Sequence, residues 1–226
     1  MTRFVTLIIA AWLSIVMVGT PTAAADAEAQ SALTSAVNGG AQPSGKDIVI
    51  EAESSVNQFA AENGLSQTTW VNLADAGVTF NPCGPATASY AYYYCPRDSV
   101  AYIGYSQAED FNDGTHYLAA AVLVAHEWGH HLQHVMNPAI AFSSKAYENG
   151  ADCVGGAWLK WFVTREGLNL GLEGVDGFWQ LAIKIETHGE PGDTHGTRYE
   201  RAFAMFSGYA WGLASCNAYA PTTLHS

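Results

Sequence analysis

One short segment of the chain carries residue types that bind a catalytic metal. Residues 126–130 read His-Glu-Trp-Gly-His, the pattern H-E-x-x-H. On an α-helix, side chains at positions i and i+4 share one face, so His126 and His130 can reach the same Zn²⁺ ion. Glu127 lies beside them and is free to take a proton from a water molecule. The pattern therefore predicts one catalytic zinc ion, with His126 and His130 as ligands and Glu127 as the general base.

A catalytic zinc site needs a third protein ligand. The longer pattern H-E-x-x-H-x-x-G-x-x-H is excluded, because Gln133 and Met136 stand where it requires Gly and His. The next expected helix begins near Ser144 and carries Glu148, and a glutamate there can complete a His₂Glu site. Asp152 follows one turn later, and we expect it to accept a hydrogen bond from a ligating histidine, which fixes that ring's tautomer.

Apolar periodicity predicts the helices that must hold these residues. The central one is expected over residues 115–137, with Pro138 ending it. Another begins at Thr197, because Thr197-Arg198-Tyr199-Glu200 is a capping-box pattern. On that last helix, Tyr199, Phe203 and Phe206 are expected to face inward. Further helices are expected over residues 48–63, 144–162 and 178–186.

The β-branched and aromatic residues lie earlier in the chain. Residues 71–80 and 100–105 predict short strands, and a loop between Cys83 and Cys95 separates them. The run of tyrosines at positions 90, 92, 93 and 94 is expected to serve packing, with a role in lining a substrate site as the alternative. Residues 100–105 are the expected edge strand for a peptide. The fold class is therefore α+β, with a small N-terminal sheet region, the active-site helix, and a mainly helical C-terminal half.

The pairing of HEWGHHLQ with E-x-x-A-D-C resembles the bacterial neutral zinc metallopeptidases, a gluzincin-like group. The resemblance continues in CG…YYYCPRD-x-x-x-Y, in DTHGT…R over residues 193–201, and in CNAY near the C-terminus. It covers residues 50–220 and implies a zincin-like fold. The chain departs from the family in having Asn149-Gly150 for Leu-Gln, and Glu200 for Gln. Since Gly costs about 1 kcal/mol relative to Ala inside a helix, we expect a looser helix at Glu148.

The same resemblance places His195, in the THGT segment, near the metal. His195 is expected either to donate a hydrogen bond to the oxyanion that forms during hydrolysis or to orient its loop. His131 and His134 share the ligand helix, and we expect them to face solvent or to support the ligands; a His130/His134 pair is the alternative ligand set. The remaining histidines, His116, His188 and His225, are expected at the surface.

Four cysteines in an exported chain predict two disulfides, with three possible pairings. The Pro and Gly around Cys83 favour a tight loop closed with Cys95, which leaves Cys153 to pair with Cys216. Both pairs also match the family's pattern. A zinc site made of cysteines is disfavoured, because the chain has no C-x-x-C.

The N-terminus predicts export. A basic start, an apolar core of about 15 residues and a small-residue end describe a signal peptide over residues 1–25, too short for a membrane anchor. Residues 26–46 are expected to be a flexible leader or pro-segment outside the core, followed by a metallopeptidase domain over 47–226. The net charge of −12, with no basic run, excludes nucleic acid as a partner and disfavours stable membrane association.

These features predict a secreted zinc metallopeptidase that hydrolyses peptides or unfolded proteins. Two alternatives remain open at this level. One is a catalytically silent zinc-binding or interaction domain on the same scaffold, which a fourth protein ligand such as His195 would favour. The other is a zinc hydrolase acting on a non-peptide amide. Serine or cysteine catalysis has little support, since no G-x-S-x-G motif occurs and all four cysteines are assigned to disulfides.

Overall fold

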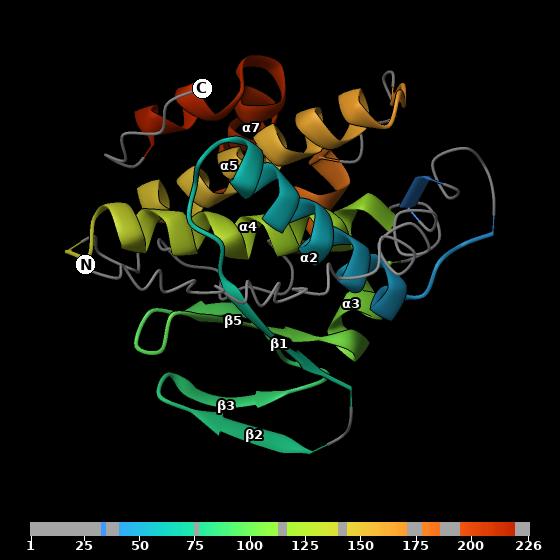
Figure 1. The fold of residues 1–226 in the computed structure, drawn as a ribbon, viewed down its shortest axis with the longest axis vertical. Helices are drawn as coiled ribbons and strands as arrows, with labels where there is room; N and C mark the ends of the chain where they lie inside the picture. Colours follow the sequence, from blue (N-terminus) through green and yellow to red (C-terminus); the bar gives the residue numbers. More distant parts are fainter. Residues whose placement is uncertain are drawn as a thin grey trace, which may run out of the picture.

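The computed structural model describes residues 33–34, 41–74, 77–112, 117–139, 144–170, 178–185 and 195–219. These segments form a mixed α+β structure in which a group of helices packs above two small sheets (Figure 1). Among them, no helix is both long enough and apolar enough to cross a membrane. The predicted signal peptide lies outside the described residues.

Two helices form the base of the core. Helix α2 (Gly45–Glu62) begins at Ser44, whose side chain accepts the Asp47 N–H, and its apolar face packs against α4. Helix α4 (Tyr117–Met136) is the predicted central helix, and it is buried on nearly every side between residues 119 and 133. A helix surrounded by other elements in this way is held rigidly, which suits a helix that carries ligands.

Four further helical segments follow α4 in the described part of the chain. Helix α5 (Lys145–Arg165) packs against α4 on one side and against α7 (Arg198–Trp211) on the other. The predicted capping box is confirmed, because Thr197 and Glu200 satisfy each other's backbone N–H groups at the start of α7. Residues 178–185 are helical, as predicted, and the 3₁₀ helix η1 (Leu213–Ala218) follows α7.

The inward face predicted for α7 is wrong. Tyr199 and Phe203 are 69% and 60% exposed, and Phe206 lies at the surface beside them. The buried face instead carries Arg201, Ala204, Met205, Ser207 and Gly208. The reason is the close crossing with α5: a Cβ on Gly208 would collide with the backbone of Cys153, so the face that carries this glycine is the one that can approach α5.

The sheet region is more divided than the sequence predicts. Strands β1 (Thr69–Leu73) and β2 (Val78–Asn81) replace the single strand expected over 71–80. The expected loop between the first two cysteines contains β3 (Gly84–Thr87) and β4 (Tyr92–Cys95). Strand β5 (Val100–Gly104) leads directly into the short helix α3 (Tyr105–Phe111).

The order of strands corrects the predicted substrate edge. The three-stranded sheet has the order β1-β5-β4, with β5 parallel to β1 and antiparallel to β4. Strand β5 is therefore central and already paired on both sides. Strand β4 is the edge that faces α4, while β2 and β3 form a separate hairpin (Figure 1).

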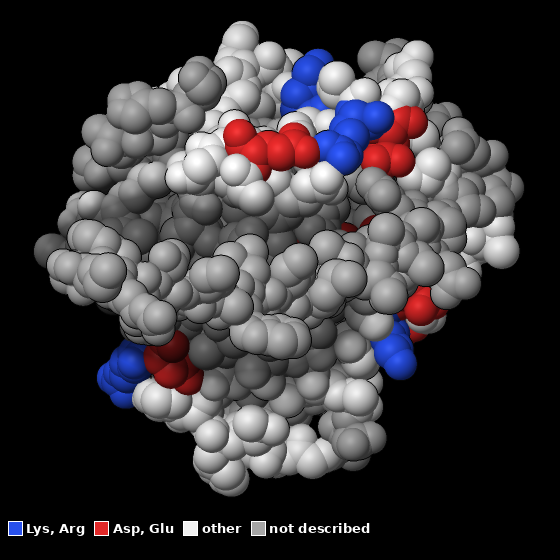
Figure 2. Space-filling view, viewed as in Figure 1, with Lys and Arg blue, Asp and Glu red and all other residues white. Residues whose placement is uncertain are grey.

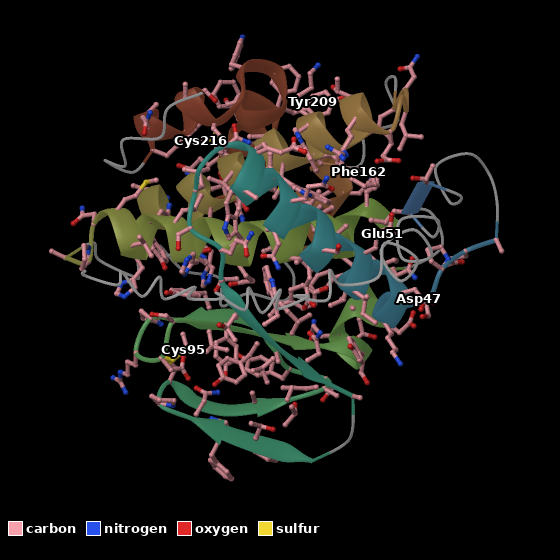
Figure 3. All side chains as sticks on the ribbon, viewed as in Figure 1. Asp47, Glu51, Cys95, Phe162, Tyr209 and Cys216 are labelled. Atoms are coloured by element: carbon pink, nitrogen blue, oxygen red, sulfur yellow. A yellow bond between two sulfur atoms is a disulfide. The ribbon has the colours of Figure 1, made fainter. Side chains whose placement is uncertain are left out.

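Both predicted disulfides are present. Cys83 pairs with Cys95, joining the β2–β3 hairpin to the end of β4, and Cys153 pairs with Cys216, joining α5 to η1. The second bond closes 63 residues, which corresponds to about 4 kcal/mol in the chain-entropy treatment of cross-links. It fixes α5 at Cys153, the residue next to Asp152, and its other end, Cys216, is labelled in Figure 3.

The expectation that residues 26–46 stay out of the core is wrong at one position. Leu33 is fully buried in the main apolar cluster, and its N–H donates to the buried Glu51 side chain at 2.7 Å. Further along, Asn112 donates to the carbonyl of Pro43, and the Gly45 N–H donates to Glu109. The described parts of this segment are thus attached to α2 and α3.

Candidate metal centre

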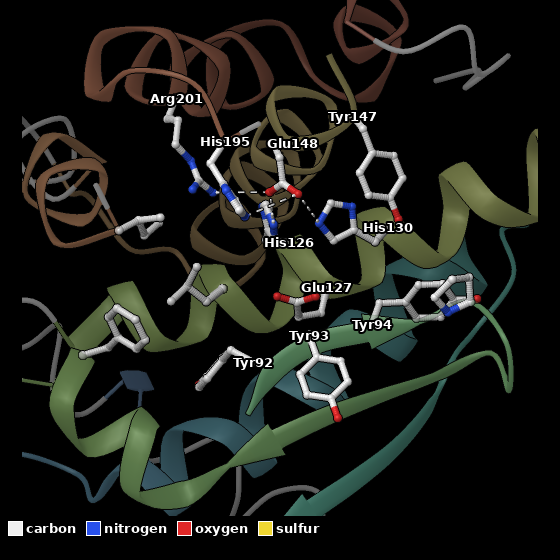
Figure 4. A pocket seen from close by; sticks show the side chains of 14 residues that line it. Tyr92, Tyr93, Tyr94, His126, Glu127, His130, Tyr147, Glu148, His195 and Arg201 are labelled. Carbon is white, nitrogen blue, oxygen red and sulfur yellow. Dashed lines mark ion pairs between the residues drawn. The ribbon is translucent and has the colours of Figure 1, made fainter. Parts of the chain in front are cut away.

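The H-E-x-x-H residues lie in the buried middle of α4. His126, Glu127 and His130 are 4%, 4% and 6% exposed. The two imidazole rings lie one turn apart, with centroids 4.5 Å from each other. Both rings project toward α5, whereas Glu127 projects toward β4 (Figure 4).

Helix α5 supplies the predicted third donor. Glu148 Oε2 lies 3.4 Å from His126 Nε2, and Glu148 Oε1 lies 3.6 Å from His130 Nε2. One donor atom from each of these three residues falls within 4.8 Å of the others, the spacing of ligands around one ion. Despite Asn149-Gly150, α5 runs unbroken from Lys145 to Arg165.

Gly129 lets α5 come close enough to bring Glu148 to the histidines. A Cβ at Gly129 would lie 2.8 Å from Ala151 Cα, a distance that real Cβ atoms essentially never show. Gly129 is one of the two variable positions in H-E-x-x-H, and Ala151 lies between Glu148 and Asp152. The glycine therefore serves close packing of the two ligand helices.

Each histidine is oriented by a bond to its other nitrogen. His126 Nδ1 lies 2.9 Å from Asp152 Oδ1, as the sequence predicts. His130 Nδ1 lies 3.1 Å from Gln133 Oε1, and Gln133 Nε2 donates to the Tyr147 carbonyl at 2.8 Å. An oxygen beside each Nδ1 requires that nitrogen to carry a proton, so each Nε2, which faces Glu148, is the nitrogen left for a metal ion. Sequence reasoning used Gln133 only to exclude a longer motif and missed this role.

Arg201 on α7 binds the Asp152 carboxylate, the group that orients His126. Its Nε and Nη2 donate to the two oxygens of Asp152 at 2.8 and 2.9 Å, and the guanidinium is 2% exposed. Nη2 also lies 4.0 Å from Glu148 Oε2. The remaining nitrogen, Nη1, is buried and has no hydrogen-bond partner in the structure. The sequence signal for Arg201 was only its place at the end of DTHGT…R.

The charges of the group depend on one another. Burial by itself would raise the pKa of Glu148 and lower that of His126, but their contacts reverse both effects. His130 and His126 hold the pKa of Glu148 well below its usual value, while Asp152 and Glu148 raise the pKa of His126 to about 10. The pKa of Asp152 is likewise lowered, because Arg201 and His126 outweigh its burial. The group without metal is thus a set of buried ion pairs that holds a proton.

Glu127 has a different environment from Glu148. Burial raises its pKa, although His126 and His130 partly oppose this, and its carboxylate accepts a hydrogen bond from the backbone of Tyr94. Its Oε2 atom is buried and has no hydrogen-bond partner among the described residues. The carboxylate faces a pocket of about 260 Å³ that also contains the two histidines and Glu148. A carboxylate placed this way can hold and accept a proton without binding the metal.

The remaining predicted histidines divide in the structure. His195 lines the same pocket, about half exposed, with Nε2 at 3.9 Å from Glu148 Oε1, and it is not one of the three grouped donors. His131 is buried and bonded to Ser66 and Tyr94. Of the two positions expected for it, the solvent-facing one is therefore wrong. Burial lowers the pKa of His131 to about 4. His116, His188 and His225 lie outside the described residues.

The donor set fits zinc. Two imidazole nitrogens and one carboxylate, all buried, would hold the ion on the pocket side, near Glu127, and would leave it accessible from the pocket. Three protein ligands with an open position are typical of catalytic zinc, whereas structural zinc is closed by four.

A family model described as "Putative neutral zinc metallopeptidase" matches residues 3–176. The chain belongs to this family. The matched region of the metallopeptidase family includes the three donor residues and Asp152, but it ends before His195 and Arg201. These two pocket residues therefore depend on the structure and on the resemblance of the THGT segment.

Curated relatives are similar over a shorter region. Uncharacterized proteins from Mycobacterium tuberculosis (Rv2575) and Mycobacterium bovis (Mb2605) are each 32% identical to the chain over 89 residues. The match covers 34% of this chain and 30% of each relative, so it spans under a third of the relatives' length. No solved structure matches the chain.

Proposed function

We propose that this protein is a zinc-dependent metallopeptidase with a zincin-like fold, built as one catalytic domain over residues 47–226. The observation that carries this proposal is the arrangement of three buried donors around one point, with the partner-free oxygen of Glu127 beside them. His126, His130 and Glu148 would hold the ion. A closed structural site would not need Glu127 in that position.

The reaction we infer is hydrolysis of a peptide bond by water. Zinc, when bound, supplies a Lewis acid that polarises the substrate carbonyl and makes water a better nucleophile near neutral pH. Glu127 takes the proton that water loses and passes it to the leaving nitrogen. Its raised pKa helps the second of these transfers, because a carboxyl group with a pKa closer to neutrality holds a proton more readily.

Two residues on the far wall of the pocket are placed to stabilise developing negative charge. His195 lines the pocket next to Glu148, and the unpartnered Nη1 of buried Arg201 belongs to a side chain that lines it too. Hydrogen-bond donors aimed at the carbonyl oxygen in the transition state can contribute a few kcal/mol. We infer that His195 donates to this oxygen, and that Arg201 acts mainly by holding Asp152.

The outer edge of β4, which pairs with no other described strand, supports a polypeptide substrate. Residues Tyr92, Tyr93 and Tyr94 of β4 line the pocket on the side opposite the histidines (Figure 4). An extended peptide can add to such an edge through main-chain hydrogen bonds, which recognise backbone rather than sequence. We therefore propose peptides and unfolded proteins as substrates, with no nucleic-acid partner.

Export is part of the same proposal. Two disulfides are typical of proteins that fold in an oxidising compartment, and the expected signal peptide over residues 1–25 would direct the chain there. Sequencing the N-terminus of the secreted protein tests it. A mature chain that begins near Asp26 is expected, and a chain that keeps Met1 in the cytoplasm would contradict export.

The deciding experiment compares wild type with Glu127→Gln, each confirmed to carry one zinc per chain, on an unfolded protein substrate. Wild type is expected to cleave it, and the variant to lose at least about 1,000-fold in kcat, because its amide cannot take a proton. Near-normal activity in the variant would refute the mechanism. No activity in either protein, together with a fourth protein ligand on the metal, would instead establish a silent zinc-binding domain.

A further inference from the structure

Tyr94 contacts the active-site helix at two successive turns. Its backbone N–H donates to the carboxylate of Glu127, and its hydroxyl lies 3.3 Å from His131 Nδ1. Glu127 and His131 are four residues apart on α4, so they share the helix face that looks toward β4. One residue of the edge strand is thus attached to the helix at both ends of a single turn.

His131 is itself fixed by its surroundings. Its ring is 5% exposed, and its Nε2 lies 2.9 Å from Ser66 Oγ in the segment between α2 and β1. The ring also meets the Tyr94 ring edge-on, with centroids 5.5 Å apart. On the same segment, the Ser66 carbonyl accepts the indole N–H of Trp128 at 2.9 Å. His131 therefore has little freedom to move, and neither has the hydroxyl bonded to it.

The register of an edge strand matters for any peptide that pairs with it. A slip of one residue turns every side chain of a strand to its opposite face. The antiparallel pairing with β5 and the Cys83–Cys95 disulfide fix β4 within the sheet region. Its position relative to α4 depends instead on contacts with that helix. The two contacts of Tyr94 with Glu127 and His131 supply such a link, and its hydroxyl also meets the Ser99 side chain in the turn before β5.

We propose that His131 and Tyr94 act as a positioning pair. The pair holds β4 in place against α4, and thereby orients Glu127 and aligns a bound peptide with the Glu127 carboxylate. This inference rests on the proposed peptidase function for its kinetic consequence, but its structural consequence is independent of activity. His131 touches neither the metal donors' Nε2 atoms nor the pocket. It acts through Tyr94.

The kinetic test uses Tyr94→Phe and His131→Phe, each loaded with one zinc per chain. Both variants keep an aromatic ring in place and remove one side of the hydroxyl–imidazole bond. Each is expected to lower kcat about tenfold with KM within about twofold, because misorientation of a proton-transfer group is felt in the transition state. The double variant is expected to be no slower than either single one. His131→Asn, whose amide can still meet the hydroxyl, is expected to recover part of kcat.

A matched control is Tyr102→Phe. This variant also removes a tyrosine hydroxyl from the same sheet, where it donates to Asp98 at 2.8 Å, but Tyr102 lies on β5 and belongs to the second apolar cluster. It is expected to lower the melting temperature and to leave kcat unchanged. If Tyr94→Phe lowers kcat no more than Tyr102→Phe does, or if the two losses at Tyr94 and His131 add independently, the positioning role is overturned.

A second readout separates this inference from the peptidase proposal. Hydrogen exchange of the Tyr94 amide, followed by NMR in the zinc-free protein, reports the bond to Glu127 whether or not the protein cleaves anything. His131→Phe is expected to speed that exchange at least about fivefold, the value of one lost hydrogen bond of ~1 kcal/mol, while Tyr102→Phe leaves it unchanged. Unchanged exchange in His131→Phe would refute the pair even if wild type proves to be a peptidase.

Discussion

Asp152→Asn tests how much the residues that surround the metal ligands contribute to the site, because it leaves the ligands themselves unchanged. Asp152 is fully buried and accepts three hydrogen bonds, one from His126 Nδ1 and two from Arg201, at 2.8 to 2.9 Å. Asparagine has the same shape but no charge, and only one of its two terminal atoms can accept a hydrogen bond. The variant therefore keeps the volume of the site while it leaves the guanidinium of Arg201 with Glu148, 4.0 Å away, as its remaining counterion.

The structure sets the size of the effect. Removing one partner of a buried ion pair costs about 3–5 kcal/mol, because the other charge stays buried without compensation. Losing the bond that orients a ligating histidine costs about 10–100-fold in metal affinity. For Asp152→Asn we therefore expect about 3 kcal/mol less stability in urea unfolding of the zinc-free protein, and zinc binding at least about tenfold weaker in a chelator competition. Activity should return at saturating zinc, since His126, His130 and Glu148 remain.

Asp98→Asn is the matched control. Asp98 also accepts a tyrosine O–H and a backbone N–H, from Tyr102 and Val100, but it lies in the sheet region away from α5. Its substitution is expected to cost stability and to leave zinc affinity unchanged. If Asp152→Asn binds zinc as tightly as wild type and is as stable as Asp98→Asn, the buried network does not support the site and the reasoning fails.

Three further outcomes follow from the same structure. Gly129→Ala must push α5 away, because its Cβ would lie 2.8 Å from the backbone of Ala151, and metal–ligand distances tolerate a change of only about 0.2 Å. Zinc affinity, measured by chelator competition, should therefore fall at least about tenfold. An unchanged affinity would contradict the close crossing of α4 and α5. Zinc binding must displace the proton of His126, whose pKa is raised to about 10, so zinc affinity should rise about tenfold per pH unit from pH 6.5 to 9. Calorimetry in two buffers should detect the released proton. A zinc affinity independent of pH would contradict this. Burial raises the pKa of Glu53 to about 7, so the folded protein keeps a proton that the unfolded chain releases, and stability should fall between pH 4.5 and 7. Glu53→Gln should therefore be up to about 3 kcal/mol more stable than wild type at pH 8 and equal to it at pH 4, as measured by urea unfolding.

The parts of the site that the sequence predicted share a local origin. His126, Glu127 and His130 lie within one turn and a half of a helix, so their spacing alone places them together. The capping box at Thr197 is equally local, and the structure contains it. Glu148 and Asp152 required one long-range step, the crossing of α5 over α4. That step was supplied by the family resemblance and by the need for a third ligand, rather than by any pattern in the residues.

What the sequence missed depends on contacts between distant elements. Gln133 looks like an ordinary polar helix residue until Tyr147 is brought beside it. Leu33, inside a polar and small-residue segment, gives no sign that it enters the core. The strands between Cys83 and Cys95 are short and contain Gly and Pro, so their local preference favours a loop; their pairing with neighbours decides otherwise.

The face that α7 turns inward shows why hydrophobicity alone gave the wrong orientation. An inward aromatic face would have held α7 away from α5, whereas the face of Arg201, Ala204, Met205 and Gly208 lets the two backbones meet. Only at that short separation can Arg201 reach both oxygens of Asp152. Since Asp152 in turn orients His126, the close packing of α5 against α7 contributes to the geometry of the metal site. A change at Gly208 would therefore reach the site through α5, although Gly208 touches none of its donors.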